Sequence, residues 1–138
     1  MPLSVAPQGP LVLLVDDFED ARVMYGQYLS RLGYRVTDAA TGEEALELAF
    51  RDRPDVILLD MLLPGVDGWE VTRRLREAAS TRTIKIIALT AHTLDRERRR
   101  IEHAGCDLFL AKPCLPADVA AAIARVLGLR QAPGGSGS

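Results

Sequence analysis

The chain has 138 residues, 48% of them hydrophobic and 26% charged, with a formal net charge of −2. That length suffices for one domain with a buried core, and the charge balance argues against nucleic acid as a direct partner, which would need a basic excess. No apolar stretch approaches the roughly 20 residues that cross a bilayer, so we expect no membrane partner.

We expect a loose leader at residues 1–10 and a single domain at residues 11–128. Residues 129–138, which end in glycine and serine, are expected to form a flexible tail. The leader lacks the basic start and apolar core of a signal peptide. Cys106 and Cys114 are too few for a disulfide framework and cannot form a zinc site alone. We therefore expect a cytoplasmic protein.

Short apolar or β-branched runs predict five strands, at Leu11–Val15, Arg35–Ala39, Val56–Leu59, Ile84–Leu89 and Leu108–Ala111. A helix with helical spacing of apolar side chains is expected after each strand. The apolar positions of the first are Ala21, Met24, Tyr25, Tyr28 and Leu32, with Gly33 as its end. The other helices are expected at a capping box of Thr41 and Glu44, along Trp69, Thr72, Leu75 and Ala79, from about Leu94 to Ala104, and from Pro116.

Five strand–helix units of this length allow right-handed crossovers onto one parallel sheet. The predicted fold is α/β: a three-layer sandwich with a five-stranded parallel sheet of order 2-1-3-4-5 and five helices, the flavodoxin-like arrangement. The alternation covers the chain without room for a second domain.

Polar residues of different kinds follow four of these apolar runs. Asp16 and Asp17 follow the first, Asp60 the third, Thr90 the fourth and Lys112 the fifth. Because ligands of parallel sheets sit beyond the carboxyl ends of the strands, we expect these side chains to converge on one edge. Any one of them alone is as well explained as an ordinary strand ending.

Three neighbouring carboxylates repel one another, and a divalent cation removes that conflict. Mg²⁺ prefers oxygen ligands and commonly combines one or two carboxylates with a phosphate, and Mn²⁺ is an alternative ion. Asp60, at the end of a buried strand, suits a nucleophile that forms an aspartyl phosphate. Lys112 is one of only two lysines beside 15 arginines, which indicates a need for a compact ammonium there.

The strings LVLLVDDFED, DVILLDMLLPGVDGWE, IIALTA and LFLAKP resemble the receiver domain of two-component response regulators, from about Leu11 to Leu127. The resemblance implies that Asp60 is the phosphoacceptor. It also implies that Asp17 is a direct Mg²⁺ ligand, that Asp16 acts through water, and that the Leu62 backbone carbonyl is a further ligand.

Further roles follow from the same resemblance. Thr90 is similar to the switch hydroxyl, Lys112 to the phosphate-binding lysine, and Phe109 to the switch aromatic, with a core aromatic as the alternative. In that family the positions of Leu62 and His92 influence water attack on the phosphoryl group, and Leu62 is expected to shield it. His92 would orient water or contact a partner, with an exposed loop histidine without a role as the alternative. Pro113 follows Lys112 through a bond that is trans by default and cis as the alternative. The run from Asp95 to Arg100 predicts a solvated helix face, with a partner-binding face as the alternative.

The implied function is a phosphorylation switch that receives its phosphoryl group from a histidine kinase or a histidine phosphotransfer protein. Output would pass through contact with a downstream protein effector, and phosphorylation-dependent pairing of two copies is compatible with the arginine-rich fourth helix. A domain excised from a hybrid kinase or a larger regulator is the alternative origin. The chain would not be an enzyme beyond slow self-dephosphorylation.

Other classes fit the sequence less well. A haloacid-dehalogenase-like phosphatase needs a second aspartate two residues after its nucleophile, where this chain has Leu62. A flavodoxin-type redox carrier needs a phosphate-cradling loop where this chain has acidic residues. A receiver used only for docking would not need the complete set of site residues.

Overall fold

The structure is a computed structural model that describes residues 9–91 and 95–129. The strands are β1 (Leu11–Val15), β2 (Arg35–Ala39), β3 (Val56–Asp60), β4 (Lys85–Thr90) and β5 (Leu108–Ala111). The helices are α1 (Glu19–Arg31), α2 (Gly42–Asp52), α3 (Gly68–Glu77), α4 (Asp95–Ala104) and α5 (Pro116–Val126). Strands and helices alternate along the described chain, as the sequence predicts.

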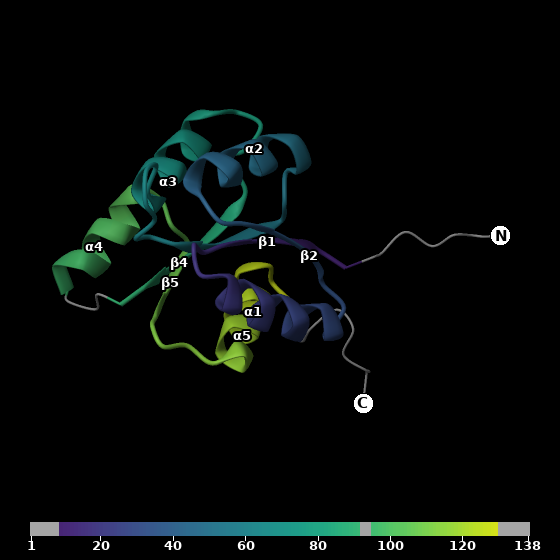
Figure 1. The fold of residues 1–138 in the computed structure, drawn as a ribbon. Helices are drawn as coiled ribbons and strands as arrows, with labels where there is room; N and C mark the ends of the chain where they lie inside the picture. The colour runs from purple at the N-terminus through teal and green to yellow at the C-terminus, as the bar shows by residue number, and fades with distance from the viewer. Residues whose placement is uncertain (1–8, 92–94, 130–138) are drawn as a thin grey trace.

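The five strands form one parallel sheet in the order β2-β1-β3-β4-β5, which confirms the predicted topology. Helices α2, α3 and α4 cover one face of the sheet, and α1 and α5 cover the other (Figure 1). The three-layer α/β sandwich is therefore confirmed. Among the described residues, no helix has both the length and the apolar character to cross a membrane.

The central strands are buried on both faces because helices cover the sheet on both sides. Alternate residues of each strand point to opposite faces, so one apolar run supplies two cores. Leu13 and Ile57 join the core beneath α2 and α3, whereas Leu14 and Leu58 join the core beneath α1 and α5. The continuous apolar runs of the sequence thus follow from burial on two sides.

Helix boundaries depend on local chemistry that the sequence carries. The Thr41 hydroxyl oxygen accepts from the Glu44 N–H at 3.1 Å, which starts α2, and the Glu44 carboxylate accepts in return from the Ala40 N–H at 2.7 Å. The predicted capping box is present, although the carboxylate reaches one residue further back than usual. Gly105, with a φ of 103°, follows α4 in a conformation that side chains disfavour.

Several predicted boundaries and faces were wrong in detail. Residue 60 lies within β3, and β4 begins one residue later and ends one residue later than the predicted run. Helix α3 ends at Glu77, so Ala79 is not part of its apolar face. The buried face of α1 runs through Tyr25 and Leu29, whereas Met24 is 45% exposed. The predicted start of the fourth helix at Leu94 lies outside the described residues.

Candidate functional site

Three carboxylates meet at the carboxyl edge of the sheet. Asp16 and Asp17 follow β1, and Asp60 ends β3, the strand that pairs with β1. Ligand oxygens from the three side chains all lie within 4.8 Å of one another. Asp16 and Asp60 are only 6% and 5% exposed, while Asp17 is exposed. The predicted convergence of these residues is present in the fold.

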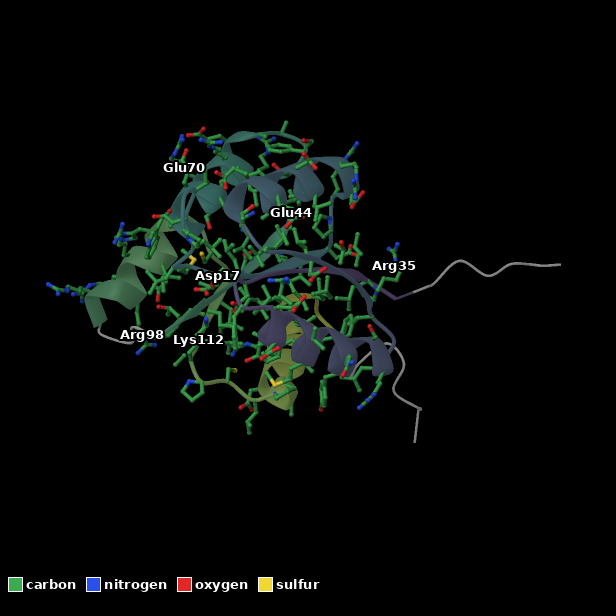
Figure 2. The ribbon with its side chains drawn as sticks, viewed as in Figure 1. Asp17, Arg35, Glu44, Glu70, Arg98 and Lys112 are labelled. Atoms are coloured by element: carbon green, nitrogen blue, oxygen red, sulfur yellow. The ribbon has the colours of Figure 1, made fainter. Side chains whose placement is uncertain are left out.

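Lys112, directly after β5, supplies the positive charge of the cluster. Its Nζ donates to Asp60 Oδ2 at 2.9 Å and to Asp16 Oδ2 at 3.4 Å. Burial lowers the pKa of Lys112, but its hydrogen bond to Asp60 and the charges of Asp60 and Asp16 outweigh that effect and raise it. The ammonium is therefore charged across the physiological pH range. Figure 2 shows Lys112 and Asp17 at the end of the sheet from which the site residues come.

Backbone donors fix the orientation of two of the carboxylates. The Phe18 N–H donates to Asp16 Oδ1 at 2.9 Å, and the Leu62 N–H donates to Asp60 Oδ1 at 2.9 Å. Each aspartate thus accepts from the residue two positions later, a local turn in which its side chain replaces a backbone acceptor. In Asp60 the other oxygen, Oδ2, contacts Lys112.

Thr90 ends β4, between the strand of Asp60 and the strand that leads to Lys112. The residue is 4% exposed, and its carbonyl accepts from the Lys112 N–H at 2.8 Å. The fold therefore brings the predicted hydroxyl to the same edge as the predicted carboxylates and ammonium. The Lys112–Pro113 peptide bond is cis, the alternative to the trans form that the sequence favours by default.

The remaining predicted residues differ in their surroundings. Leu62 is 55% exposed although it is apolar, and it lies two residues after Asp60. Phe109 is half-buried on β5 and packs against the core beneath α2 and α3. The Arg98 guanidinium carbon lies 4.8 Å from its ring centroid. A second stack places Arg100 over Trp69 at 4.1 Å. His92 lies outside the described residues.

The run from Asp95 to Arg100 predicts a solvated helix face, and Arg98, Arg99 and Arg100 are exposed. Arg98 and Arg100 also lie over aromatic rings of β5 and α3, contacts that the sequence did not predict. Such cation–π contacts contribute roughly 0.5–1 kcal/mol at exposed sites. They connect α4 to both of its neighbours, and Figure 2 shows Arg98 on this helix.

The sequence did not indicate a role for Arg22, which lies on α1 and contacts the backbone of Asp16 and not its carboxylate. Its Nη1 donates to the backbone carbonyl of Asp16 at 2.8 Å, and its Nε donates to Asp38 Oδ2 at 2.8 Å. Nothing distinguishes this arginine from other helical arginines in the sequence, because Asp38 comes from β2, sixteen residues further on. Only the fold joins the two.

The donor set fits a small, hard cation. All its side-chain ligands from the part of the chain that the structure describes would be carboxylate oxygens, the type that Mg²⁺ and Mn²⁺ accept, and no described histidine or cysteine belongs to the cluster. A single lysine does not neutralise three carboxylates, so a divalent ion would complete the charge balance. Geometry and charge thus describe an acidic cluster with one lysine at the carboxyl edge of a flavodoxin-like sheet.

This fold and site define the class of phosphoacceptor signalling domains. The chain belongs to the response regulator receiver domain family, which matches residues 12–124. It is a receiver domain of two-component signalling, as its sequence motifs indicate. The family assignment argues against the phosphatase and the flavodoxin-type redox carrier.

Curated relatives agree with this assignment. The chain is 41% identical over 104 residues to the transcriptional regulatory protein AfsQ1 of Streptomyces coelicolor, a match that covers 75% of this chain but 45% of AfsQ1. It is 37% identical over 102 residues to the polar-differentiation response regulator DivK of Brucella anthropi, a match that covers 74% of this chain and 83% of DivK. The match thus spans less than half the length of AfsQ1 and most of the length of DivK.

Solved structures show the same fold. Chemotaxis protein CheY4 of Vibrio cholerae superposes with a TM-score of 0.82 at 32% identity, over 86% of this chain and 99% of CheY4. The receiver domain of sensor histidine kinase PA1611 of Pseudomonas aeruginosa superposes with a TM-score of 0.80 at 39% identity, over 88% of this chain and 99% of that domain. The latter structure has a magnesium ion coordinated in its active-site cleft.

Proposed function

We propose that Asp60 accepts a phosphoryl group from a phosphohistidine, which belongs to a histidine kinase or a histidine phosphotransfer protein. The phosphorylated domain, residues 11–128, would then signal through contact with a downstream protein effector. The single observation that carries the proposal is the contact between Lys112 Nζ and Asp60 Oδ2 at 2.9 Å, within a cluster of three carboxylates. This arrangement pairs a nucleophilic oxygen with the cation that would later meet phosphoryl oxygens.

In the proposed transfer, an Asp60 carboxylate oxygen attacks phosphorus. The new O–P bond forms as the N–P bond to the donor imidazole breaks, and the imidazole nitrogen keeps the electron pair and takes up a proton. Lys112 then contacts a phosphoryl oxygen, and the hydroxyl of Thr90 donates to another. Phe109 would respond as the switch aromatic.

Asp16, Asp17, Asp60 and the carbonyl of Leu62 would hold Mg²⁺, with Mn²⁺ as a substitute. When bound, the ion would supply positive charge that offsets the repulsion between the acidic residues and the phosphoryl group. The fit of the carboxylate oxygens supports this assignment. A related receiver domain with magnesium in its cleft supports it by similarity.

The same proposal covers the location of the protein and its partners. We place the protein in the cytoplasm, where phosphohistidine donors of this kind present their phosphoryl groups. Its partners would be proteins and not nucleic acid. Pairing of two phosphorylated copies through α4, β5 and α5 is compatible with the exposed arginines of α4.

Acetyl phosphate with Mg²⁺ is expected to add one phosphoryl group to the intact protein, and EDTA is expected to prevent it. Asp60→Asn should abolish the gain because the attacking carboxylate oxygen is lost. Asp55→Asn is the matched control, since Asp55 lies near the opposite end of β3, where its carboxylate accepts from the Leu11 N–H at 2.7 Å. Intact mass spectrometry measures the gain.

Unchanged labelling of Asp60→Asn would refute the phosphoacceptor assignment. Absence of any gain in wild-type protein, under conditions that label a known receiver, would leave a docking module as the better description.

Leu62→Asn is expected to shorten the lifetime of the phosphorylated state several-fold. The exposed leucine offers no hydrogen bond to water beside the acceptor, whereas an amide would hold water near phosphorus. The decay of the phosphorylated mass after removal of acetyl phosphate measures the lifetime. Leu115→Asn is the control, because Leu115 is a comparably exposed leucine, at 68%, in another loop. An unchanged lifetime in Leu62→Asn would contradict the shielding role.

A further inference from the structure

The backbone of Asp16 is held on both sides by groups connected to β2. Its N–H donates to the Ala39 carbonyl at 3.1 Å, and its carbonyl accepts from Arg22 Nη1 at 2.8 Å. Asp16 and Asp17 leave β1 at this point and provide two of the three carboxylates of the site. The first contact closes the pairing of β1 with β2 beside Val15 and Ala39, whereas the contact with Arg22 adds a restraint that the sheet does not provide.

Arg22 is itself oriented by a second contact. Its Nε donates to Asp38 Oδ2 at 2.8 Å, and its side chain is only 14% exposed. The guanidinium is planar and presents its donors in a fixed fork, so engaging one donor sets the direction of the others. Asp38, on the edge strand β2, thus fixes the direction in which Nη1 meets the Asp16 carbonyl.

The Asp16 carbonyl belongs to the peptide unit that joins Asp16 to Asp17. Because that unit is planar, anchoring its oxygen restricts the rotation of both residues and therefore the directions of both carboxylates. Without this anchor, the repulsion between neighbouring carboxylates would favour a loop in which they separate. A cation would then have to bring them together on binding.

We propose that Arg22, oriented by Asp38, is a positioning residue that preorganises the acidic loop for a divalent cation. The proposal rests on the proposed function for the identity of the site as a Mg²⁺ site, but it concerns binding of the ion and not phosphoryl transfer. Residues that orient metal ligands without contacting the metal themselves typically lower metal affinity by about 10–100-fold when they are replaced. Arg22 is such a group although it lies outside the ligand set.

The test measures Mg²⁺ affinity by calorimetry on the full chain without a phosphoryl donor. Arg22→Met removes the forked donors but keeps much of the side-chain volume, and is expected to weaken Mg²⁺ binding about 10-fold or more. Arg22→Lys, which has one ammonium for two acceptors, should lie between this variant and wild type. Asp38→Asn should also weaken binding, because it loosens the orientation of Arg22.

Arg76→Met is the matched control. Arg76 likewise pairs with a carboxylate, Asp107, at 2.9 Å and donates to backbone carbonyls, including that of Gly105 at 2.9 Å. These contacts involve β5 and the end of α4, at the edge of the sheet opposite to the acidic cluster. The control is expected to lower the melting temperature without Mg²⁺ but to leave Mg²⁺ affinity within about twofold of wild type.

Wild-type affinity in Arg22→Met and Arg22→Lys would overturn the proposal, as would an equal loss of affinity in Arg76→Met. If Arg22→Met does not fold, the Arg22→Lys and Asp38→Asn variants decide the outcome in the same titration. Absence of Mg²⁺ binding in wild type would refute both the metal site and its positioning. Normal Mg²⁺ binding without phosphorylation would refute the phosphoacceptor function alone.

Discussion

Lys112→Met is expected to slow phosphoryl gain from acetyl phosphate about 100-fold, the scale found when one charged or polar donor is removed from a developing anion. In the resting protein, Nζ contacts Asp60 and Asp16, so the lysine already stands where phosphoryl charge would develop. Methionine keeps the length and apolar stem of the side chain but offers no donor. The initial rate of mass gain with Mg²⁺ measures the effect.

The same change is expected to lower the free energy of unfolding without Mg²⁺ by about 1–2 kcal/mol. Removing the ammonium leaves Asp16 and Asp60 buried beside each other with less compensation, and unpaired buried polar groups cost about this much. Chemical denaturation measures the loss. Because the Lys112 side chain is 33% exposed, solvent screens part of the interaction and keeps the effect below that of a fully buried pair.

Lys85→Met provides the matched control, since Lys85 is the other lysine of the chain and lies exposed at the start of β4. It should label at the wild-type rate. If Lys112→Met labels as fast as Lys85→Met, the proposed role of Lys112 is wrong.

The raised pKa of Lys112 predicts how its ion pair with Asp60 depends on pH. Its pKa in the folded protein is raised above 10.5, so the ion pair contributes its full stability below pH 10.5 and loses it as the pH rises through the raised value. Lys112 should therefore not limit labelling between pH 6 and 9. A loss of labelling that follows lysine titration inside that window would contradict the assignment.

Gly68→Ala is expected to lower the free energy of unfolding by about 2–3 kcal/mol. A Cβ at this first residue of α3 would lie 2.6 Å from Met61 Cα, 2.8 Å from Met61 Sδ and 2.9 Å from the Asp60 carbonyl oxygen. Two of these atoms belong to the backbone of Asp60 and Met61, so relief requires α3 or the end of β3 to move. Phosphoryl gain should slow as well, because Asp60 belongs to that backbone.

Gly26→Ala is the contrasting control. Gly26 lies inside α1, and an added Cβ would meet Leu14 Cδ1 at 3.6 Å and Val36 Cγ1 at 3.7 Å, which are ordinary contacts. Alanine should stabilise the helix by about 0.5–1 kcal/mol and leave labelling unchanged. Thermal and urea unfolding of both variants check the opposite signs. If both substitutions change the free energy of unfolding by the same amount, the close approach at Gly68 carries no energetic cost and the prediction is wrong.

The features predicted best from sequence are those that depend on neighbours in the chain. Burial on two faces requires continuous apolar strands, which is why the run Leu11–Val15 is recognisable without its partners. The capping box of Thr41 and Glu44 closes within a few residues. The gathering of Asp16, Asp60 and Lys112 also follows, because the ends of parallel strands share an edge.

The faces of α1 were harder to predict, for a physical reason. Met24 is as apolar as a core residue, but the position of α1 on the sheet turns Leu29 inward instead. Spacing along a helix gives the width of the apolar face, whereas the direction in which that face is turned depends on the layer against which the helix packs.

The sequence by itself determined the class of fold and the set of residues that meet at the site, since these depend on local periodicity and on the polarity of parallel strands. The strand order is what the resemblance to receiver domains implies, because the same alternation is compatible with other orders. Only the tertiary structure decided which distant residues support that set. Arg22 meets Asp38 and the Asp16 carbonyl, and Arg98 covers Phe109, through contacts between elements that no local pattern encodes. An arginine has the same helical preference whether it faces solvent, a carbonyl or a ring, so its partner is fixed only when the layers pack.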